Sequence, residues 1–226
     1  MKYLIILLSL FIVGCSNLSK ERVYYSNGNL KSEISTDNNS VKNGPILNYF
    51  EDGRVAVKGY FKDDKRDKKW YFYDENTGNI SAIETYKDGE LEGEQLYYYP
   101  NGKLKLKGSY KDNIRIGFWQ MYDEDGKLTV QNIFLDGEKV ISVALFQENG
   151  NLLCSGLTKN GLRDGIWQYY DESGILLYDV EYVSGIRDGE WKAYDKAGNI
   201  IATGYYNEGE CSPLVAVLAR PQNRCL

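Results

Sequence analysis

Histidine is absent from the 226-residue chain. Catalysis by Ser-His or Cys-His pairs is therefore excluded. The four cysteines include no Cys-x-x-Cys pair, the spacing that metal sites commonly use. The net charge is −5 and no basic stripe runs along the chain, which argues against nucleic-acid binding. We expect a protein that is not an enzyme and that holds no metal and no cofactor.

Long hydrophobic runs are also lacking. The one apolar run, residues 3–13, is too short to cross a hydrocarbon core about 30 Å thick, but it suits a secretory signal peptide. Its end, Ile12-Val13-Gly14-Cys15, resembles the lipobox of bacterial lipoproteins. The resemblance implies cleavage before Cys15 and acylation of this residue, with palmitate-type chains. The lipid bilayer would then hold an exported, membrane-anchored lipoprotein, in the outer membrane if the host is Gram-negative. The alternative is an ordinary signal peptide in which Cys15 is incidental.

Glycine is abundant, at 23 residues, and a sequence period accounts for most of it. Eight glycines are each followed two residues later by an aliphatic residue, and they recur every 24 or 25 residues: Gly28, Gly53, Gly78, Gly102, Gly126, Gly150, Gly174 and Gly198. Several stand in Asn-Gly or Asp-Gly pairs, which favour tight hairpin turns. A fixed period of this length indicates a repeat architecture.

Within each repeat, apolar and polar residues alternate. After Gly102, for example, Leu104 and Leu106 alternate with Lys103 and Lys105. Period 2 indicates a strand with one buried face. The segment before each turn is also rich in strand-forming residues. Its aromatic residues stand at both odd and even distances from the turn glycine, so we expect a bulge there. The sequence predicts an all-β, elongated antiparallel β-hairpin array of about eight hairpins of 24–25 residues. Its predicted segments are a signal peptide (1–14), a tether (15–22), the array (23–210) and a tail (211–226).

Tryptophan recurs with the same period, at Trp70, Trp119, Trp167 and Trp191. The period favours core positions over a stacking platform for sugar rings. Six residues after every second turn glycine stands a further glycine, at Gly59, Gly108, Gly156 and Gly204, where an aromatic ring could lie close to the backbone. Cys154 falls on an inward position and is expected to be a buried small hydrophobe. Acidic groups such as Asp123 and Asp171 are expected to serve the turns.

The pattern Gly-x-Trp-x-x-Tyr-x-x-x-Gly-x-Leu, at Gly165–Leu176, resembles the MORN repeat in its bacterial variant. That family implies hairpin arrays used as binding or scaffolding surfaces, without shared catalytic residues. We therefore expect a cell-envelope lipoprotein that acts as a non-catalytic protein-interaction or scaffold module with an unknown protein partner. Two alternatives stay open. One is binding of a carbohydrate or cell-envelope polymer, with a glycan as ligand, and the other is an antitoxin or immunity-type partner.

The candidate binding surface lies among outward positions of the last three repeats, where apolar residues gather: Leu153, Leu157, Ile175, Leu177, Ile201 and Tyr205. An apolar patch of this size on a monomer indicates a contact surface. The apolar tail is expected to fold back on this face or on the sheet edge, held by a disulfide between Cys211 and Cys225. The alternative is a disordered tail, which would leave the patch as the partner site.

Overall fold

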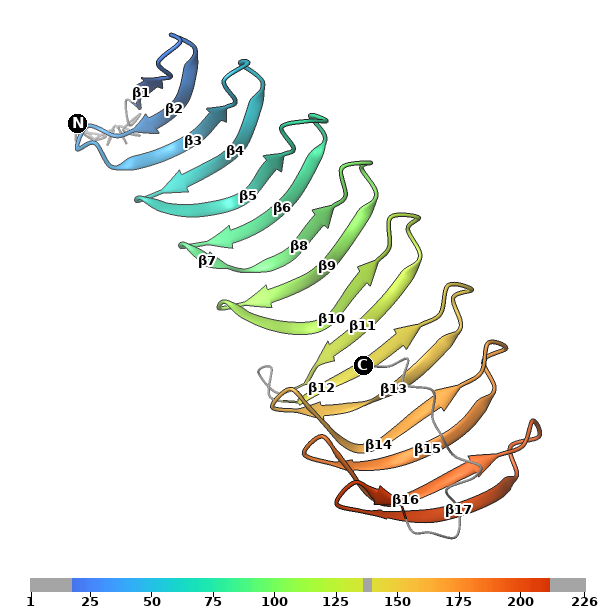
Figure 1. Ribbon diagram of the computed structural model, residues 1–226. Coiled ribbons are helices and arrows are strands. Elements are labelled where there is room, and N and C mark those ends of the chain that lie inside the picture. Colours follow the sequence, from blue (N-terminus) through green and yellow to red (C-terminus); the bar gives the residue numbers. More distant parts are fainter. Residues whose placement is uncertain (1–17, 136–139, 212–226) are drawn as a thin grey trace, which may run out of the picture.

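The computed structural model describes residues 18–135 and 140–211, which form strands and turns without any helix. Eighteen strands pair antiparallel in one open sheet, in the order of the chain (Figure 1). Their bounds are β1 Ser19–Tyr24, β2 Leu30–Thr36, β3 Lys42–Tyr49, β4 Val55–Lys62, β5 Lys65–Tyr73, β6 Ile80–Lys87, β7 Glu90–Leu91, β8 Gly93–Tyr98, β9 Leu104–Lys111, β10 Ile114–Tyr122, β11 Leu128–Phe134, β12 Val140–Phe146, β13 Leu152–Lys159, β14 Leu162–Tyr170, β15 Leu176–Val183, β16 Ile186–Tyr194, β17 Ile200–Asn207 and β18 Glu210–Cys211. The predicted all-β hairpin array is confirmed.

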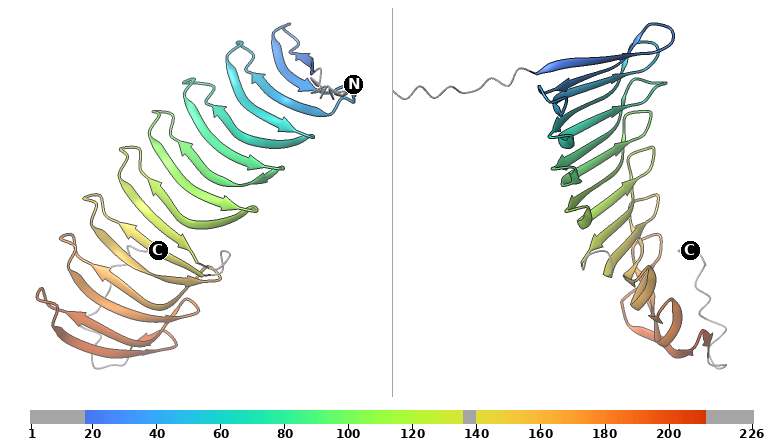
Figure 2. Two further views of the ribbon diagram at one scale, coloured as in Figure 1. Left: turned by 180° about the vertical axis from the view of Figure 1, so that it is seen from behind. Right: turned by 90° about the vertical axis from the view of Figure 1, so that its left-hand side faces the viewer.

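The sheet is a single curved layer along the described part of the chain (Figure 2). The short strands β7 and β8 both pair with β6 and act as one interrupted strand. Every other strand pairs with its neighbours in sequence, as in β9 with β10 and β10 with β11. A lone hairpin cannot bury its own side chains, so each hairpin depends on its neighbours in the stack.

The turn glycines close the hairpins as the sequence predicts. At Gly102 the φ angle is 81°, the Gly102 amide donates to the Tyr99 carbonyl at 2.9 Å, and the Tyr99 amide donates to Lys103. Asn101 links this turn to the next one, because its side-chain amide donates to the Glu124 carbonyl at 3.1 Å. Asn29, Asn79 and Asn149 reach the next turn in the same way. This amide ladder holds successive hairpins in register at one edge of the array.

The opposite edge carries two-residue turns that join one hairpin to the next. In the turn between β6 and β7, Asp88 and Gly89 both have positive φ, at 51° and 93°. Two positive φ angles define the type I′ geometry that matches the twist of paired strands. The Gly89 amide also donates to the Arg66 carbonyl at 2.9 Å. Both edges of the array are therefore linked by hydrogen bonds between hairpins.

The predicted bulge is present, and β10 shows that there are two. Its register with β11 shifts between Met121 and Tyr122, next to the turn. Its register with β9 shifts between Ile116 and Gln120, around the tryptophan. Each bulge adds a residue to one strand. The two shifts therefore explain why the aromatic residues before each turn stand at both odd and even distances from the turn glycine.

Candidate functional site

The alternation of side chains gives the sheet two distinct faces. The tryptophan face carries the four tryptophans and one continuous cross-strand row: Val57, Phe72, Ala82, Tyr97, Leu106, Met121, Val130, Leu145, Cys154, Tyr169, Tyr178, Ala193 and Ala202. The middle row of the opposite face is Leu47, Lys58, Tyr71, Ile83, Leu96, Lys107, Gln120, Gln131, Ala144, Ser155, Gln168, Asp179, Lys192 and Thr203. The first row has one residue from each of the strands β4–β6 and β8–β17, and the second row has one from each of β3–β6 and β8–β17.

The four tryptophans are core residues, as their period predicts. Their exposed fractions lie between 1% for Trp191 and 5% for Trp119. The indole N–H groups of Trp70, Trp119 and Trp167 donate to backbone carbonyls of the preceding strand, at 3.2, 3.2 and 2.8 Å. Rings buried to this degree cannot stack on a ligand. The structure thus removes the tryptophans as a platform for sugar rings.

Glycine makes room for each ring, as the sequence analysis expects. A β-carbon added to Gly156 would come within 2.5 Å of the Trp167 ring. Gly59, Gly108 and Gly204 meet Trp70, Trp119 and Trp191 in the same way. The first three of these pairs recur every second hairpin, so the structural unit there is a pair of hairpins.

Arginine covers the other side of three of these rings, and this feature was missed from the sequence. The guanidinium carbons of Arg66, Arg115 and Arg163 lie 4.5, 5.1 and 4.4 Å from the centroids of Trp70, Trp119 and Trp167. The signal that could have found it is the spacing Arg-x-x-x-Trp, which occurs in each of these repeats. A cation over an indole face stabilises by about 0.5–2 kcal/mol.

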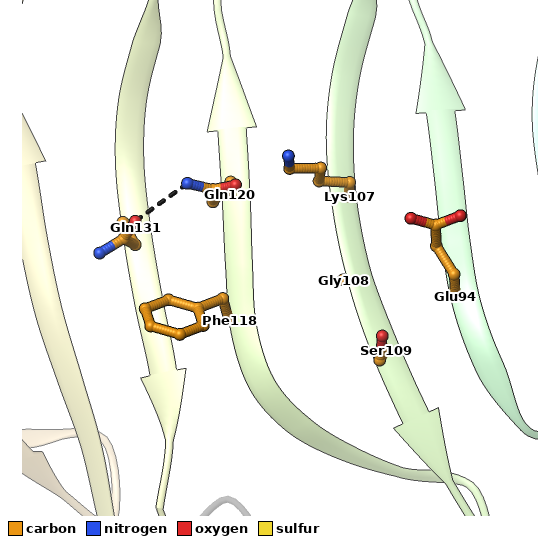
Figure 3. Close-up of a pocket in the computed structure, with 7 residues that line it drawn as sticks. All are labelled: Glu94, Lys107, Gly108, Ser109, Phe118, Gln120 and Gln131. Atoms are coloured by element: carbon orange, nitrogen blue, oxygen red, sulfur yellow. Dashed lines mark hydrogen bonds between the residues drawn. The ribbon is translucent and has the colours of Figure 1, made fainter.

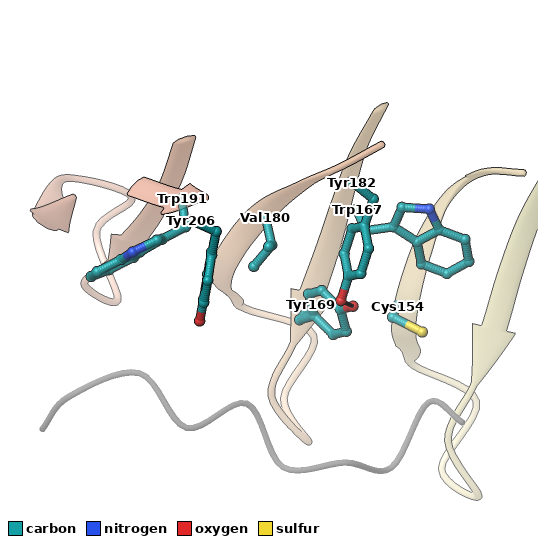
Figure 4. Close-up of a cluster of buried hydrophobic side chains, with 7 residues drawn as sticks. All are labelled: Cys154, Trp167, Tyr169, Val180, Tyr182, Trp191 and Tyr206. Atoms are coloured by element: carbon teal, nitrogen blue, oxygen red, sulfur yellow. Dashed lines mark hydrogen bonds between the residues drawn. The ribbon is translucent and has the colours of Figure 1, made fainter. Parts of the chain in front are cut away.

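A polar cluster joins the last two tryptophan repeats, and Figure 4 shows its two tyrosines, Tyr169 and Tyr182, among the buried side chains. The hydroxyls of Tyr169 and Tyr182 lie 2.9 Å apart, and Arg163 donates to both, at 3.1 and 3.3 Å. Arg187 donates to Tyr182 at 3.3 Å. Burial acts to raise the pKa of Tyr182, but hydrogen bonds from Tyr169 and the two arginines lower it overall. Burial raises the pKa of Tyr169. These hydrogen bonds join β14, β15 and β16, so the cluster serves packing.

The opposite face leaves large apolar side chains in contact with solvent. Leu157, Leu177, Ile201 and Tyr205, four of the candidate surface residues, are 43%, 39%, 66% and 56% exposed. Leu153 is the second residue of β13, close to the turn at Gly150, and is half-buried. Ile175 lies in the turn before β15, where its amide donates to the Asp171 carboxylate.

The middle row divides these candidate residues into two groups. Leu153, Leu177 and Ile201 lie near the turn-glycine ends of their strands, whereas Leu157 and Tyr205 lie toward the other ends. Further exposed apolar residues on the same face were not among the candidates, and they include Ile116, Phe118 and Ile166, which are 41%, 59% and 59% exposed. The exposed apolar surface therefore extends back to β10.

The opposite face carries charges of both signs, which gather at different places. Lysines lie on it in the first half, at Lys58, Lys69, Lys103, Lys105 and Lys107, together with the carboxylates of Asp67 and Glu94. Carboxylates lie on it in the second half, at Asp164, Asp179, Glu181 and Glu190, together with Lys159 and Lys192. A shallow depression of about 400 Å³ lies between Glu94, Lys107 and Phe118 (Figure 3). Gln120 donates to Gln131 at 2.9 Å at its rim.

The structure also describes the turn carboxylates that the sequence analysis singled out. The carboxylates of Asp123 and Asp171 accept backbone amides of their own turns, as expected. No group of three metal-ligating residues occurs within 18–135 and 140–211, and no helix there is long and apolar enough to cross a membrane.

Cys154 is fully buried, as predicted, but it is disulfide-bonded and not only a small hydrophobe. Cys15 and Cys225, and with them the proposed Cys211–Cys225 bond, lie outside the described residues; of Cys211 only the backbone is described.

Comparison with known proteins supports the repeat. Four stretches match the MORN repeat variant: residues 19–38, 91–112, 163–184 and 187–208. No curated protein matches the chain. Matching solved structures include the crystal structure of TcdB2-TccC3, with 14% identity over 82% of this chain and 13% of that chain, and a TM-score of 0.26. The crystal structure of TcdB2-TccC3-Cdc42 matches with 13% identity over 84% of this chain and 12% of that chain, and a TM-score of 0.24. The described chain is thus a hairpin array in which four stretches match the MORN repeat variant, and repeats of this kind suggest a protein-interaction module.

Proposed function

We propose that this protein is a non-catalytic interaction module that binds a protein partner along its opposite face. The carrying observation is the contrast between the two faces. The tryptophan face is occupied by its own indole, glycine and arginine contacts. The opposite face exposes Phe118, Ile166 and Ile201 to solvent by 59% or more. Exposed apolar groups among polar ones are typical of interaction surfaces.

The lysines around β9 and the carboxylates of β15 on this face would select the chemistry of the partner. A partner that lies along the array would place acidic groups near Lys103, Lys105 and Lys107 and basic groups near Asp179 and Glu181. Charge complementarity of this kind sets orientation and speeds association more than it adds affinity. The apolar residues on β10, β14 and β17 would supply the binding energy.

We further propose that acylated Cys15 holds this module at a membrane as a cell-envelope lipoprotein. The support is the lipobox-like segment that ends at Cys15 and the short apolar run before it. Two or more acyl chains give stable anchoring, because each buried methylene contributes about 0.8 kcal/mol. The protein would then be exported and would present the array beside the bilayer. The glycan alternative has weaker support, since the tryptophan rings are buried.

Site-specific photocrosslinking in intact cells tests the proposed face. A photoreactive residue replaces Phe118 or Ile166 on the opposite face, and, as matched controls, Tyr86 on the tryptophan face or Glu124 in an exposed turn. We expect one and the same protein adduct from both opposite-face positions and no such adduct from the controls. Equal labelling from all four positions would contradict a partner on this face.

A further inference from the structure

The disulfide of Cys154 needs a partner, and the chain offers three. Cys154 is fully buried on β13, in the middle of the tryptophan face. The chain has four cysteines, so the bonded residue is Cys15, Cys211 or Cys225. A disulfide requires Cα atoms within about 7 Å of each other. This limit can be compared with the strand positions of the candidates.

Cys211 is too far away. Its Cα stands in register with Tyr206 of β17, on the short strand β18. The strands β14, β15, β16 and β17 lie between β18 and β13. At about 4.8 Å between neighbouring strands, the separation is roughly 24 Å.

Cys15 is excluded in the same way. It precedes Ser19 of β1 by four residues, which reach at most about 14 Å. The strand β1 lies eleven strand spacings from β13 along the array, or roughly 50 Å. Cys225 follows Cys211 by fourteen residues, and an extended segment of that length reaches about 46–50 Å. Only Cys225 can therefore reach Cys154.

The burial of the tryptophan face points to the same segment. Eight residues after the turn glycine, the aromatic residues of the earlier repeats are half-buried: Phe61, Tyr86, Tyr110 and Phe134. Their equivalents in the last two repeats, Tyr182 and Tyr206, are only 4% exposed. Tyr206 lies on β17, next to the end of the sheet, where a single layer should leave a side chain most exposed. The Arg187 guanidinium carbon lies 5.5 Å from the centroid of the Tyr206 ring, but that of Arg66 lies 5.2 Å from the centroid of Tyr86, which is still half-buried. Arginine alone therefore does not account for the burial of Tyr206.

We propose that Cys225 is the residue bonded to Cys154, and that residues 212–226 run across the tryptophan face from β17 to β13. The apolar run Leu214-Val215-Ala216-Val217-Leu218 would pack on Tyr182 and Tyr206 and cap the open end of the array. The opposite face would stay free for a partner. Formation of the bond removes two protons and two electrons from the two thiols. A protein disulfide of the thiol–disulfide exchange class accepts them and leaves as a dithiol, as in an oxidising compartment.

Peptide mapping of the full-length protein without reduction tests the bond. Trypsin cuts after Lys139, Lys159, Lys196 and Arg224 but not at the Arg220-Pro221 bond, so the three cysteines fall on separate peptides, 140–159, 197–224 and 225–226. We expect the mass of 140–159 joined to 225–226, lost in Cys225→Ser and kept in the matched control Cys211→Ser. A bond between 197–224 and 225–226, or a free thiol on 140–159, would overturn the proposal.

Hydroxyl-radical footprinting of the full chain tests the position of the segment. Val217→Asp should raise the oxidation of Tyr182 and Tyr206 severalfold, whereas the control Gln222→Glu, outside the apolar run, should not. Tyr86 and Tyr110 in the same sample report on the rest of the array and should keep their reactivity. If they also change, the milder Val217→Ser replaces the variant. Unchanged oxidation of Tyr182 and Tyr206 would show that another element covers them.

Discussion

The indole of Trp167 lies directly on the backbone of Gly156, where a β-carbon would come within 2.5 Å of the ring atoms Cδ2 and Cγ. The φ angle of Gly156 is not positive, so its backbone conformation does not demand glycine. The requirement for glycine arises from the ring alone. The indole N–H also donates to the Leu157 carbonyl at 2.8 Å, which fixes the ring in place.

Replacement of Gly156 by alanine should therefore destabilise the array. The methyl group would force the Trp167 ring away from the strand, and overpacking of this kind costs about 1–3 kcal/mol. The change is measured as a shift in the free energy of unfolding in urea. Ser155→Ala, one residue away on the opposite face, is the control and should shift it little. Equal effects from both variants would contradict the close contact.

Replacement of Trp167 by alanine should cost about 3–5 kcal/mol, as for other buried large aromatic residues. Its neighbour Ile166 is 59% exposed on the opposite face and serves as control, with an expected change of about 0.5 kcal/mol or less for Ile166→Ala. Chemical denaturation of the array separates the two. A shift below about 1 kcal/mol for Trp167→Ala would reject a core role.

Alkaline pH should unfold the C-terminal repeats. Burial raises the pKa of Tyr178 to about 12, from an ordinary value of 10.0, because the folded state favours the neutral phenol. The stability from this residue is fully present below pH 10 and is lost as pH rises through 12. With no histidine in the chain, stability should stay nearly flat between about pH 6 and 9.

Denaturation at a series of pH values measures this dependence. Tyr178→Phe should make the decline above pH 10 less steep, because the phenol that must ionise is gone. Tyr205→Phe, at an exposed tyrosine, is the matched control. An unchanged decline in Tyr178→Phe would assign the alkaline effect to other groups.

If acylated Cys15 anchors the protein, the Cys15→Ser variant should lose its attachment to the membrane. Without the acylated residue, the protein should move from the detergent phase to the aqueous phase in detergent-phase partitioning. Radiolabelled palmitate incorporation by the unchanged protein, and its loss in the variant, gives a second readout. Partitioning of Cys15→Ser with detergent, at the level of the unchanged chain, would show that Cys15 is not the anchor.

The sequence was sufficient to predict the hairpins and the core role of the tryptophans. Both depend on local rules, since a turn glycine such as Gly102 acts within four residues and period 2 assigns a strand its faces. The sequence also indicated that Gly156 makes room for an aromatic ring. It did not indicate which ring. The two bulges of each hairpin break the strict alternation of faces between the turn and the tryptophan, so counting residues does not give the face of the ring.

Other features depend on contacts between hairpins. Asn101 reaches the Glu124 carbonyl of the next turn, and the Tyr169 hydroxyl meets that of Tyr182 on the neighbouring strand. Neither contact has a local signature, because each requires the register of neighbouring strands. The sequence by itself determined the repeating hairpin, whose turns and alternation are properties of a few consecutive residues. Only the tertiary structure decided which side chains share a face, because that depends on strand register, on bulges and on what covers Tyr206 at the end of the sheet.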